Sequence, residues 1–136
     1  MRRTTSLGLL FASAVWAGAQ SPIQQAPPKA ANLVNPLQAI VQAQRAGEKL
    51  FARECAACHG RDRQGTGKAP SLNRAEVYRA APGTLFWVLR NGSLHHGMPS
   101  FAHLPEAERW QIISFLQRVR SKQSMPDPGR DHKEGR

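Results

Sequence analysis

The sequence predicts a single small all-α domain with an additional segment at each end. The chain has 136 residues, enough for one domain and too few for two. Apolar residues recur at helical spacing, and no alternating run is long enough to form a sheet. Its two cysteines are too few to cross-link a small scaffold, so another group must help to hold the core.

The first segment, residues 1–19, has the features of an export signal. A basic start is followed by a short apolar run and a small-residue site that a signal peptidase could cut near Ala19. These parts are Arg2 and Arg3, Leu7–Trp16, and Ala17–Ala19. We therefore expect a periplasmic or secreted protein with no transmembrane segment after the signal is removed.

Two further segments carry too few large apolar side chains to form a core. Residues 20–35 are rich in Pro, Gln and Ala, and residues 123–136 combine prolines, glycines and mixed charges. Neither composition offsets the entropy cost of ordering the chain. We expect a flexible leader over 20–35, a flexible tail over 123–136, and one folded domain over 36–122.

Capping residues predict where the helices of this domain begin and end. Asn35 is expected to cap a long helix that starts at Pro36 and runs to about Cys55. Further helices are expected over Asn73–Arg79, over Leu85–Arg90, and from Pro105 to about Lys122. Acidic residues at the start of the last helix and basic residues at its end suit the helix dipole.

The basic charge is scattered along the chain. Nineteen Lys and Arg against nine Asp and Glu give a net charge of +10. In a nucleic-acid-binding protein this excess would gather on one stripe or helix, so we expect no nucleic-acid partner. The charge is instead expected to steer the protein toward acidic protein surfaces.

The clearest chemical motif is Cys55-Ala56-Ala57-Cys58-His59, at the end of the predicted first helix. Two thiols at this spacing can form thioethers with one haem, and the next imidazole can ligate its iron from the same side. The motif uses both cysteines of the chain. We therefore expect one haem c, attached through Cys55 and Cys58, with His59 as an iron ligand.

Three other interpretations use the same atoms. A dithiol redox pair would favour a helix N-terminus after a strand, whereas this pair follows a helix. A zinc site needs four ligands, and the next histidine is as far along the chain as His95. A structural disulfide would not need the adjacent histidine. These alternatives stay open here, with covalent haem favoured.

With this motif, the sequence over residues 37–120 resembles the class I c-type cytochromes, which are small single-haem electron carriers. The resemblance implies a cytochrome c-like fold of about three to five helices around one covalently bound haem. Gly47 and Phe51 match the positions at which the family's first helix crosses its last. They would meet Ile112 and Phe115, and a glycine there lets two backbones approach closely.

The same resemblance assigns roles to residues that follow the motif. Pro70 matches a proline whose carbonyl accepts the Nδ1 proton of the ligand histidine and so leaves Nε2 for the iron. Leu72 is expected to line the haem pocket. Trp87 and Arg90 could donate hydrogen bonds to the haem propionates, and a core Trp87 and a solvated Arg90 fit the sequence equally well.

The sixth iron ligand implied by the resemblance is Met98, in a loop between Gly97 and Pro99. Its thioether is a soft neutral ligand that raises the reduction potential. His95 and His96 lie close by, and either of them could compete for the iron and lower the potential. An open or displaceable sixth position would instead indicate a haem enzyme or a sensor of gas or redox state.

These expectations describe an electron carrier rather than an enzyme. Iron ligated on both faces has no vacant position for a substrate, so single electrons pass between redox partners. The expected partners are a periplasmic dehydrogenase, a terminal oxidase or both. The chain is expected to act as a monomer or as a subunit of a complex, for example the electron-accepting subunit of a dehydrogenase or oxidase chain.

Overall fold

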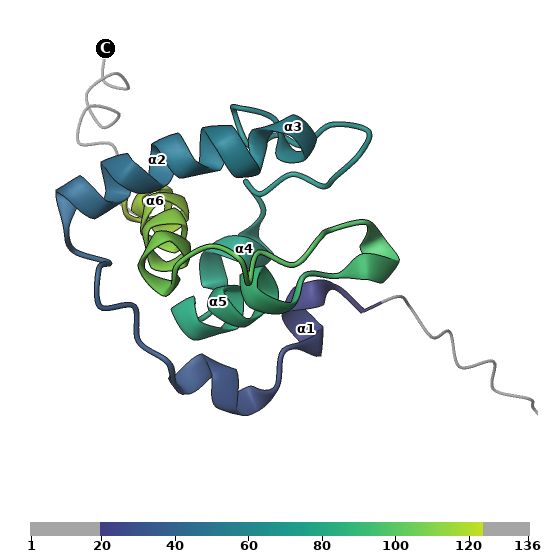
Figure 1. Cartoon of the computed structure of the whole chain (residues 1–136), viewed down its shortest axis with the longest axis horizontal. Helices are drawn as coiled ribbons and strands as arrows, with labels where there is room; N and C mark the ends of the chain where they lie inside the picture. Colours follow the sequence, from purple (N-terminus) through teal and green to yellow (C-terminus); the bar gives the residue numbers. More distant parts are fainter. Residues whose placement is uncertain (1–19, 124–136) are drawn as a thin grey trace, which may run out of the picture.

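The computed structural model describes residues 20–123 of the chain, with side chains described up to Arg118 (Figure 1). The helices are α1 (Pro22–Gln25), η1 (Pro28–Asn32), α2 (Val41–Glu54), α3 (Ala56–His59), α4 (Ala75–Arg79), α5 (Pro82–Asn91), η2 (Leu94–His96) and α6 (Glu106–Gln123). Over these described residues only isolated β-bridges accompany the helices. The all-α prediction is confirmed, with six α-helices in place of the expected three to five because α1 and α3 are single turns.

The predicted signal over 1–19 and nearly all of the predicted tail over 123–136 lie outside the described residues. Among the described helices, none combines the length and apolar character that a membrane crossing requires.

Helices α2 and α6 cross with their backbones in contact (Figure 1). A Cβ atom added to Gly47 would lie only 1.9 Å from the backbone oxygen of Gln111 on α6. Beside this contact, the rings of Phe51 and Phe115 are 5.5 Å apart. The crossing that the family resemblance implies is therefore present, and it depends on the absence of a side chain at Gly47.

Helix α2 begins later than the sequence predicts, and the expected start at Pro36 is wrong. The side chain of Asn35 does make a local cap, because its Oδ1 accepts a hydrogen bond from the backbone N–H of Leu37 at 2.9 Å. Its Nδ2, however, donates to the backbone oxygen of Trp110 and to Ser114 Oγ at 3.2 and 3.0 Å. These bonds to α6 bury Asn35 and hold the following residues in a turn, so α2 starts only at Val41.

The leader predicted to be flexible is folded in the structure. We call residues 20–34 the strap, because α1 and η1 wrap along α5 (Figure 1). A Cβ atom on Gly83 of α5 would lie 2.0 Å from the backbone oxygen of Ala30, and Ala30 is itself buried. Small residues thus let two backbones meet, which composition alone could not indicate.

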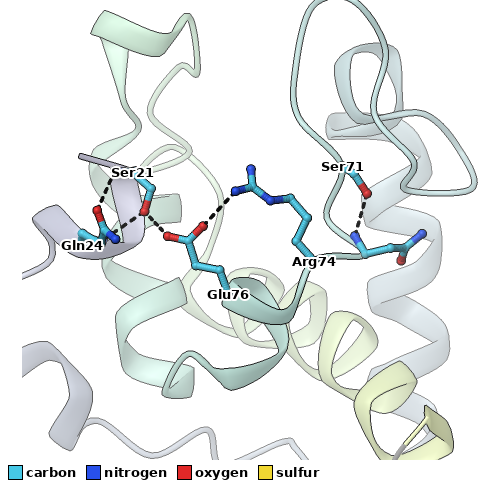
Figure 2. Close-up of polar contacts among 6 residues, drawn as sticks. Ser21, Gln24, Ser71, Arg74 and Glu76 are labelled. Carbon is cyan, nitrogen blue, oxygen red and sulfur yellow. Dashed lines mark hydrogen bonds and ion pairs between the residues drawn. The ribbon is translucent and has the colours of Figure 1, made fainter. Parts of the chain in front are cut away.

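A polar cluster holds the beginning of the strap (Figure 2). Ser21 and Gln24 form a capping box at the start of α1, and the hydroxyl of Ser21 also donates to a carboxylate oxygen of Glu76 on α4. The other carboxylate oxygen of Glu76 pairs with Arg74 at 3.4 Å. The strap is therefore fixed at one end by Ser21 and at the other by Asn35.

Helix α6 is buried on more than one side, as the sequence predicts. Its buried residues include Arg109, Trp110, Ile112, Ile113, Ser114, Phe115, Leu116 and Gln117. Trp110 stacks on Phe86 of α5 with ring centroids 4.1 Å apart. The last helix thus contacts α2 on one face and α5 on another.

Candidate functional site

The Cys55–His59 motif forms the turn that ends α2. The backbone N–H of Cys55 bonds to Phe51 O at 2.9 Å, and the N–H of His59 bonds to Cys55 O at 2.9 Å. Helix α3 is this single turn, and it places two thiols and an imidazole at one corner of the fold. Cys55 is buried, Cys58 is exposed and His59 is half-buried.

The buried position of Cys55 makes its thiol hard to ionise. Burial, with the nearby charge of Glu54 and the neighbouring Cys58, raises the pKa of the Cys55 thiol to about 12. Neither cysteine is in a disulfide in the described structure. A dithiol redox pair needs an accessible, readily formed thiolate, so the environment of Cys55 argues against that interpretation.

The imidazole of His59 is oriented by one hydrogen bond. Its Nδ1 lies 2.9 Å from the backbone oxygen of Pro70, and because a carbonyl can only accept, Nδ1 carries the proton. The lone pair of Nε2 is then available to a metal. The family resemblance implied this bond from the position of Pro70, and the structure contains it.

The loop between His59 and Pro70 folds back on itself. The N–H of Gly65 bonds to His59 O at 2.8 Å, and the hydroxyl of Thr66 donates to Cys58 O at 2.7 Å. Gly65 has a φ of +84°, and a Cβ atom there would lie 2.7 Å from Ala69 O. A glycine at this turn lets Pro70 reach the histidine.

Arg63 ties this loop to α6, a role that the sequence analysis missed. Its backbone oxygen accepts hydrogen bonds from Leu72 N at 2.8 Å and from Ser71 Oγ at 3.1 Å. Its guanidinium lies 5.3 Å from the ring centre of Phe115, a cation–π distance. Arg63 adopts a φ of +63°, which is uncommon for a residue with a side chain. Nothing in its sequence neighbours indicates this conformation.

Met98 lies on a tight hairpin that follows α5. The backbones of Ser93 and Met98 pair as an antiparallel bridge. The distance from Ser93 N to Met98 O is 2.8 Å, and that from Met98 N to Ser93 O is 3.0 Å. The side chain of Met98 is partly buried and packs against the core, as does that of Leu72. Gly97 takes a left-handed conformation with a φ of +75°, which closes the hairpin.

The two histidines near Met98 are at the tip of the same hairpin. His95 and His96 belong to the short helix η2, and both are exposed. Nδ1 of His96 lies 2.8 Å from Ser93 Oγ, within the hairpin itself. Of the three candidate sixth ligands, Met98 is the one that contacts the core.

Arg109 holds the chain that follows the hairpin, a role that was not predicted from the sequence. Its Nη1 donates to the backbone oxygens of three residues in the turn before α6, at 3.3, 3.1 and 2.9 Å. These are Phe101, Ala102 and Leu104. The guanidinium also lies over the ring of Phe86 at 4.8 Å, and the residue is buried. In the sequence, the position of this arginine on the apolar face of a helical pattern could have indicated its buried role.

The residues at this corner fit a covalently held haem. His59 presents an imidazole whose tautomer is fixed, and the residue directly before it, Cys58, is exposed and carries a free thiol. Leu72 and Met98 are only partly buried at the edge of the core, so they leave apolar surface for a large apolar group to cover. Over the described residues, no cluster of three or more His, Cys, Asp or Glu gathers as a metal site would require. The zinc interpretation thus has no support there.

A comparison with protein families agrees with this chemistry. The family model described as cytochrome c oxidase, cbb3-type, subunit III, matches residues 42–116, which include the whole Cys55–His59 motif and Met98. The chain belongs to this family. It is therefore a haem-binding cytochrome that transfers electrons, with a class I c-type cytochrome domain.

The comparison with solved structures supports the fold of this cytochrome. The crystal structure of cytochrome cL from the marine methylotrophic bacterium Methylophaga aminisulfidivorans MPT matches with a TM-score of 0.56 and 24% sequence identity. The match covers 79% of this chain and 71% of the other. The predicted cytochrome c-like fold is confirmed. No curated protein matches the chain.

Two of the expected cofactor-binding residues lie together beside the strap. Trp87 and Arg90 line a groove between α5 and the strap, beside Lys29 and Leu33. Arg90 is exposed and Trp87 is half-buried. The structure thus groups these two residues with the strap, whereas Cys58, His59 and Pro70 are grouped with the α3 corner.

Proposed function

We propose that the cytochrome is an exported single-electron carrier whose one haem c is attached through Cys55 and Cys58 and ligated by His59 and Met98. The observation that carries this proposal is the hydrogen bond between His59 Nδ1 and Pro70 O. When bound, the haem supplies a reversible one-electron iron couple. The chain supplies the ligands, the orientation and the exclusion of water.

His59 has the simplest task, which is to keep one nitrogen directed at the metal. The Pro70 carbonyl holds the proton on Nδ1, and the bonds of Gly65 and Thr66 to the turn keep that carbonyl in place. A fixed imidazole loses less entropy on ligation and favours one tautomer. This is the arrangement expected of a permanent ligand rather than of a proton-transfer group.

Met98 is supported as the second ligand by its place on the hairpin. Its side chain packs on the core, while His95 and His96 are exposed at the tip. Ligation by a thioether would give a higher potential than ligation by a second imidazole. With both faces of the iron ligated, the protein would carry electrons and would not bind a substrate at the metal.

Export and partners complete the proposal. Residues 1–19 would serve as a signal that is cut near Ala19, and the remaining chain would work in the periplasm or outside the cell. Its redox partners would be a periplasmic dehydrogenase, a terminal oxidase or both. Trp87 and Arg90 line the groove beside the strap, and their hydrogen bonds to the haem propionates stay a prediction.

Ligand variants test the proposal by absorption spectroscopy and reduction potential. Met98→Ala is expected to give a high-spin ferric spectrum, a lower potential and binding of carbon monoxide, whereas His95→Ala and His96→Ala should leave the spectrum nearly unchanged. If Met98→Ala stays low-spin and the double histidine variant turns high-spin, the ligand is a histidine. A red, normally folded His59→Ala protein would reject the assignment of His59.

A further inference from the structure

The strap and α5 enclose a groove of about 470 Å³. Phe86 and Trp87 of α5 and Leu33 of the strap give it apolar walls. Lys29 stands on the strap side and Arg90 on the α5 side, and none of the residues lining the groove is acidic. It therefore combines apolar surface with positive charge from both walls.

Two adjoining apolar residues at this groove are exposed. The side chain of Leu33 is 49% exposed and that of its neighbour Val34 is 78% exposed. Both belong to the strap, a segment that is held at Ser21 and Asn35 and so presents them in a defined position. Adjoining exposed apolar residues beside a concave site indicate a surface that another molecule covers.

The end of α5, which lines the groove, is joined to the hairpin that carries Met98. The hydroxyl of Ser100 donates to Arg90 O at 2.6 Å, which joins the end of α5 to the chain just after Met98. A Cβ atom on Gly92 would lie 2.6 Å from the carbonyl carbon of Pro99, so these two backbones touch as well. A molecule in the groove would thus contact an element that adjoins the proposed ligand hairpin.

We propose that this groove is a docking site for a segment of a redox partner in which acidic residues flank one large apolar side chain. The apolar side chain would lie between Leu33 and Trp87, and the acidic residues would pair with Lys29 and Arg90. The inference rests on the proposed function as an electron carrier, because only a redox partner gains from docking beside the Met98 hairpin.

Other occupants fit the groove less well. Two copies of this chain that met through the same face would bring Lys29 and Arg90 of one copy against those of the other, and like charges repel. A lipid surface is broad and flat, whereas this site is concave. The charge and shape together favour a protein segment.

Nuclear magnetic resonance on the haem-loaded, reduced protein tests this proposal. The probe is a synthetic peptide in which glutamates flank a central phenylalanine, and the control peptide has lysines in place of the glutamates. The glutamate peptide should shift the Trp87 indole N–H and the backbone amides of Lys29 and Leu33. The lysine peptide should leave them unchanged.

Variants at residues outside the Cys55–His59 motif and the Met98 hairpin separate docking from cofactor binding. Lys29→Glu and Leu33→Ser should each weaken the glutamate peptide by about fivefold, whereas Lys49→Glu, an exposed charge reversal on α2, should change its affinity less than twofold. All three should keep the reduction potential and spectrum of the parent, so a failed haem assignment would show separately in the ligand variants.

Three outcomes would overturn the docking proposal. The glutamate peptide could leave the groove resonances unmoved, or Lys49→Glu could weaken it as much as Lys29→Glu does. The protein could instead sediment with phosphatidylglycerol vesicles through Lys29 and Leu33 while ignoring the peptide, which would assign the surface to a membrane.

Discussion

Two contacts in this cytochrome are built in the same way and yet differ in what depends on them. At the α2–α6 crossing, Gly47 meets the backbone of Gln111, and at the strap, Gly83 meets the backbone of Ala30. In both places a Cβ atom would lie within about 2 Å of a backbone oxygen. The first contact joins the two longest helices, whereas the second attaches a peripheral segment to one helix.

The two contacts differ in how much of the fold is lost when each of them opens. If α2 and α6 separate, the rings of Phe51 and Phe115 lose their packing and the α3 corner loses its support. If the strap lifts from α5, we expect the rest of the core to stay closed, because only Ala30 and Ile23 of the strap pack against it. The same local geometry should therefore have a global consequence at Gly47 and a local one at Gly83.

The largest effect is expected from Gly47→Ala. Its new Cβ would overlap Gln111 O at 1.9 Å and Gln111 C at 2.4 Å, and neither backbone atom can move without separating the helices. We expect a loss of about 3 kcal/mol or more in the free energy of unfolding, measured by urea denaturation of the haem-loaded protein. A stability equal to that of the parent would show that the crossing tolerates a wider separation.

A smaller effect is expected from Gly83→Ala. The new Cβ would lie 2.0 Å from Ala30 O, but here the strap can move away. We expect a loss of about 1 to 2 kcal/mol, faster protease cleavage within residues 20–34, and an unchanged haem spectrum. Gly67→Ala is the matched control, because nothing lies within 4 Å of its Cβ position. Loss of the haem spectrum in Gly83→Ala would show that the strap supports the core.

The smallest effect is expected from Ser21→Ala at the beginning of the strap. This change removes the bonds of the hydroxyl to Glu76 and to Gln24 N, both near the surface. We expect a loss of about 1 kcal/mol or less, with faster amide hydrogen exchange confined to α1. Faster exchange throughout α5 would mean that the strap is released as one unit and that its two ends depend on each other.

The sequence predicted the first of the two contacts and missed the second for a physical reason. Gly47 and Phe51 lie within a helical pattern, and a family resemblance marked the crossing. Gly83 stands near the start of a helix and Ala30 in a segment poor in large apolar residues, so neither offered a periodic pattern. Contact between two backbones leaves no apolar pattern in the sequence.

The residues of the candidate site also fall into two groups, those that sequence spacing indicates and those whose contacts form only in the folded chain. Residues at fixed spacing, such as Cys55, Cys58 and His59, could be proposed from the sequence because their chemistry depends on neighbours in the sequence. Arg63 and Arg109 were missed because they act on carbonyls and rings that only the folded chain brings close. Asn35 was misread for the same reason, since its bonds to α6 compete with helix capping.

The burial of Cys55 bears on how the proposed thioether would form. Cys55 is only 8% exposed, and burial raises the pKa of its thiol to about 12, so in the closed domain the thiol is neither accessible nor readily ionised. If Cys55 carries a thioether, as proposed, that bond must form while the end of α2 is still open. Haem attachment would then come before the domain closes, and the closed fold would form only after the thioether is made.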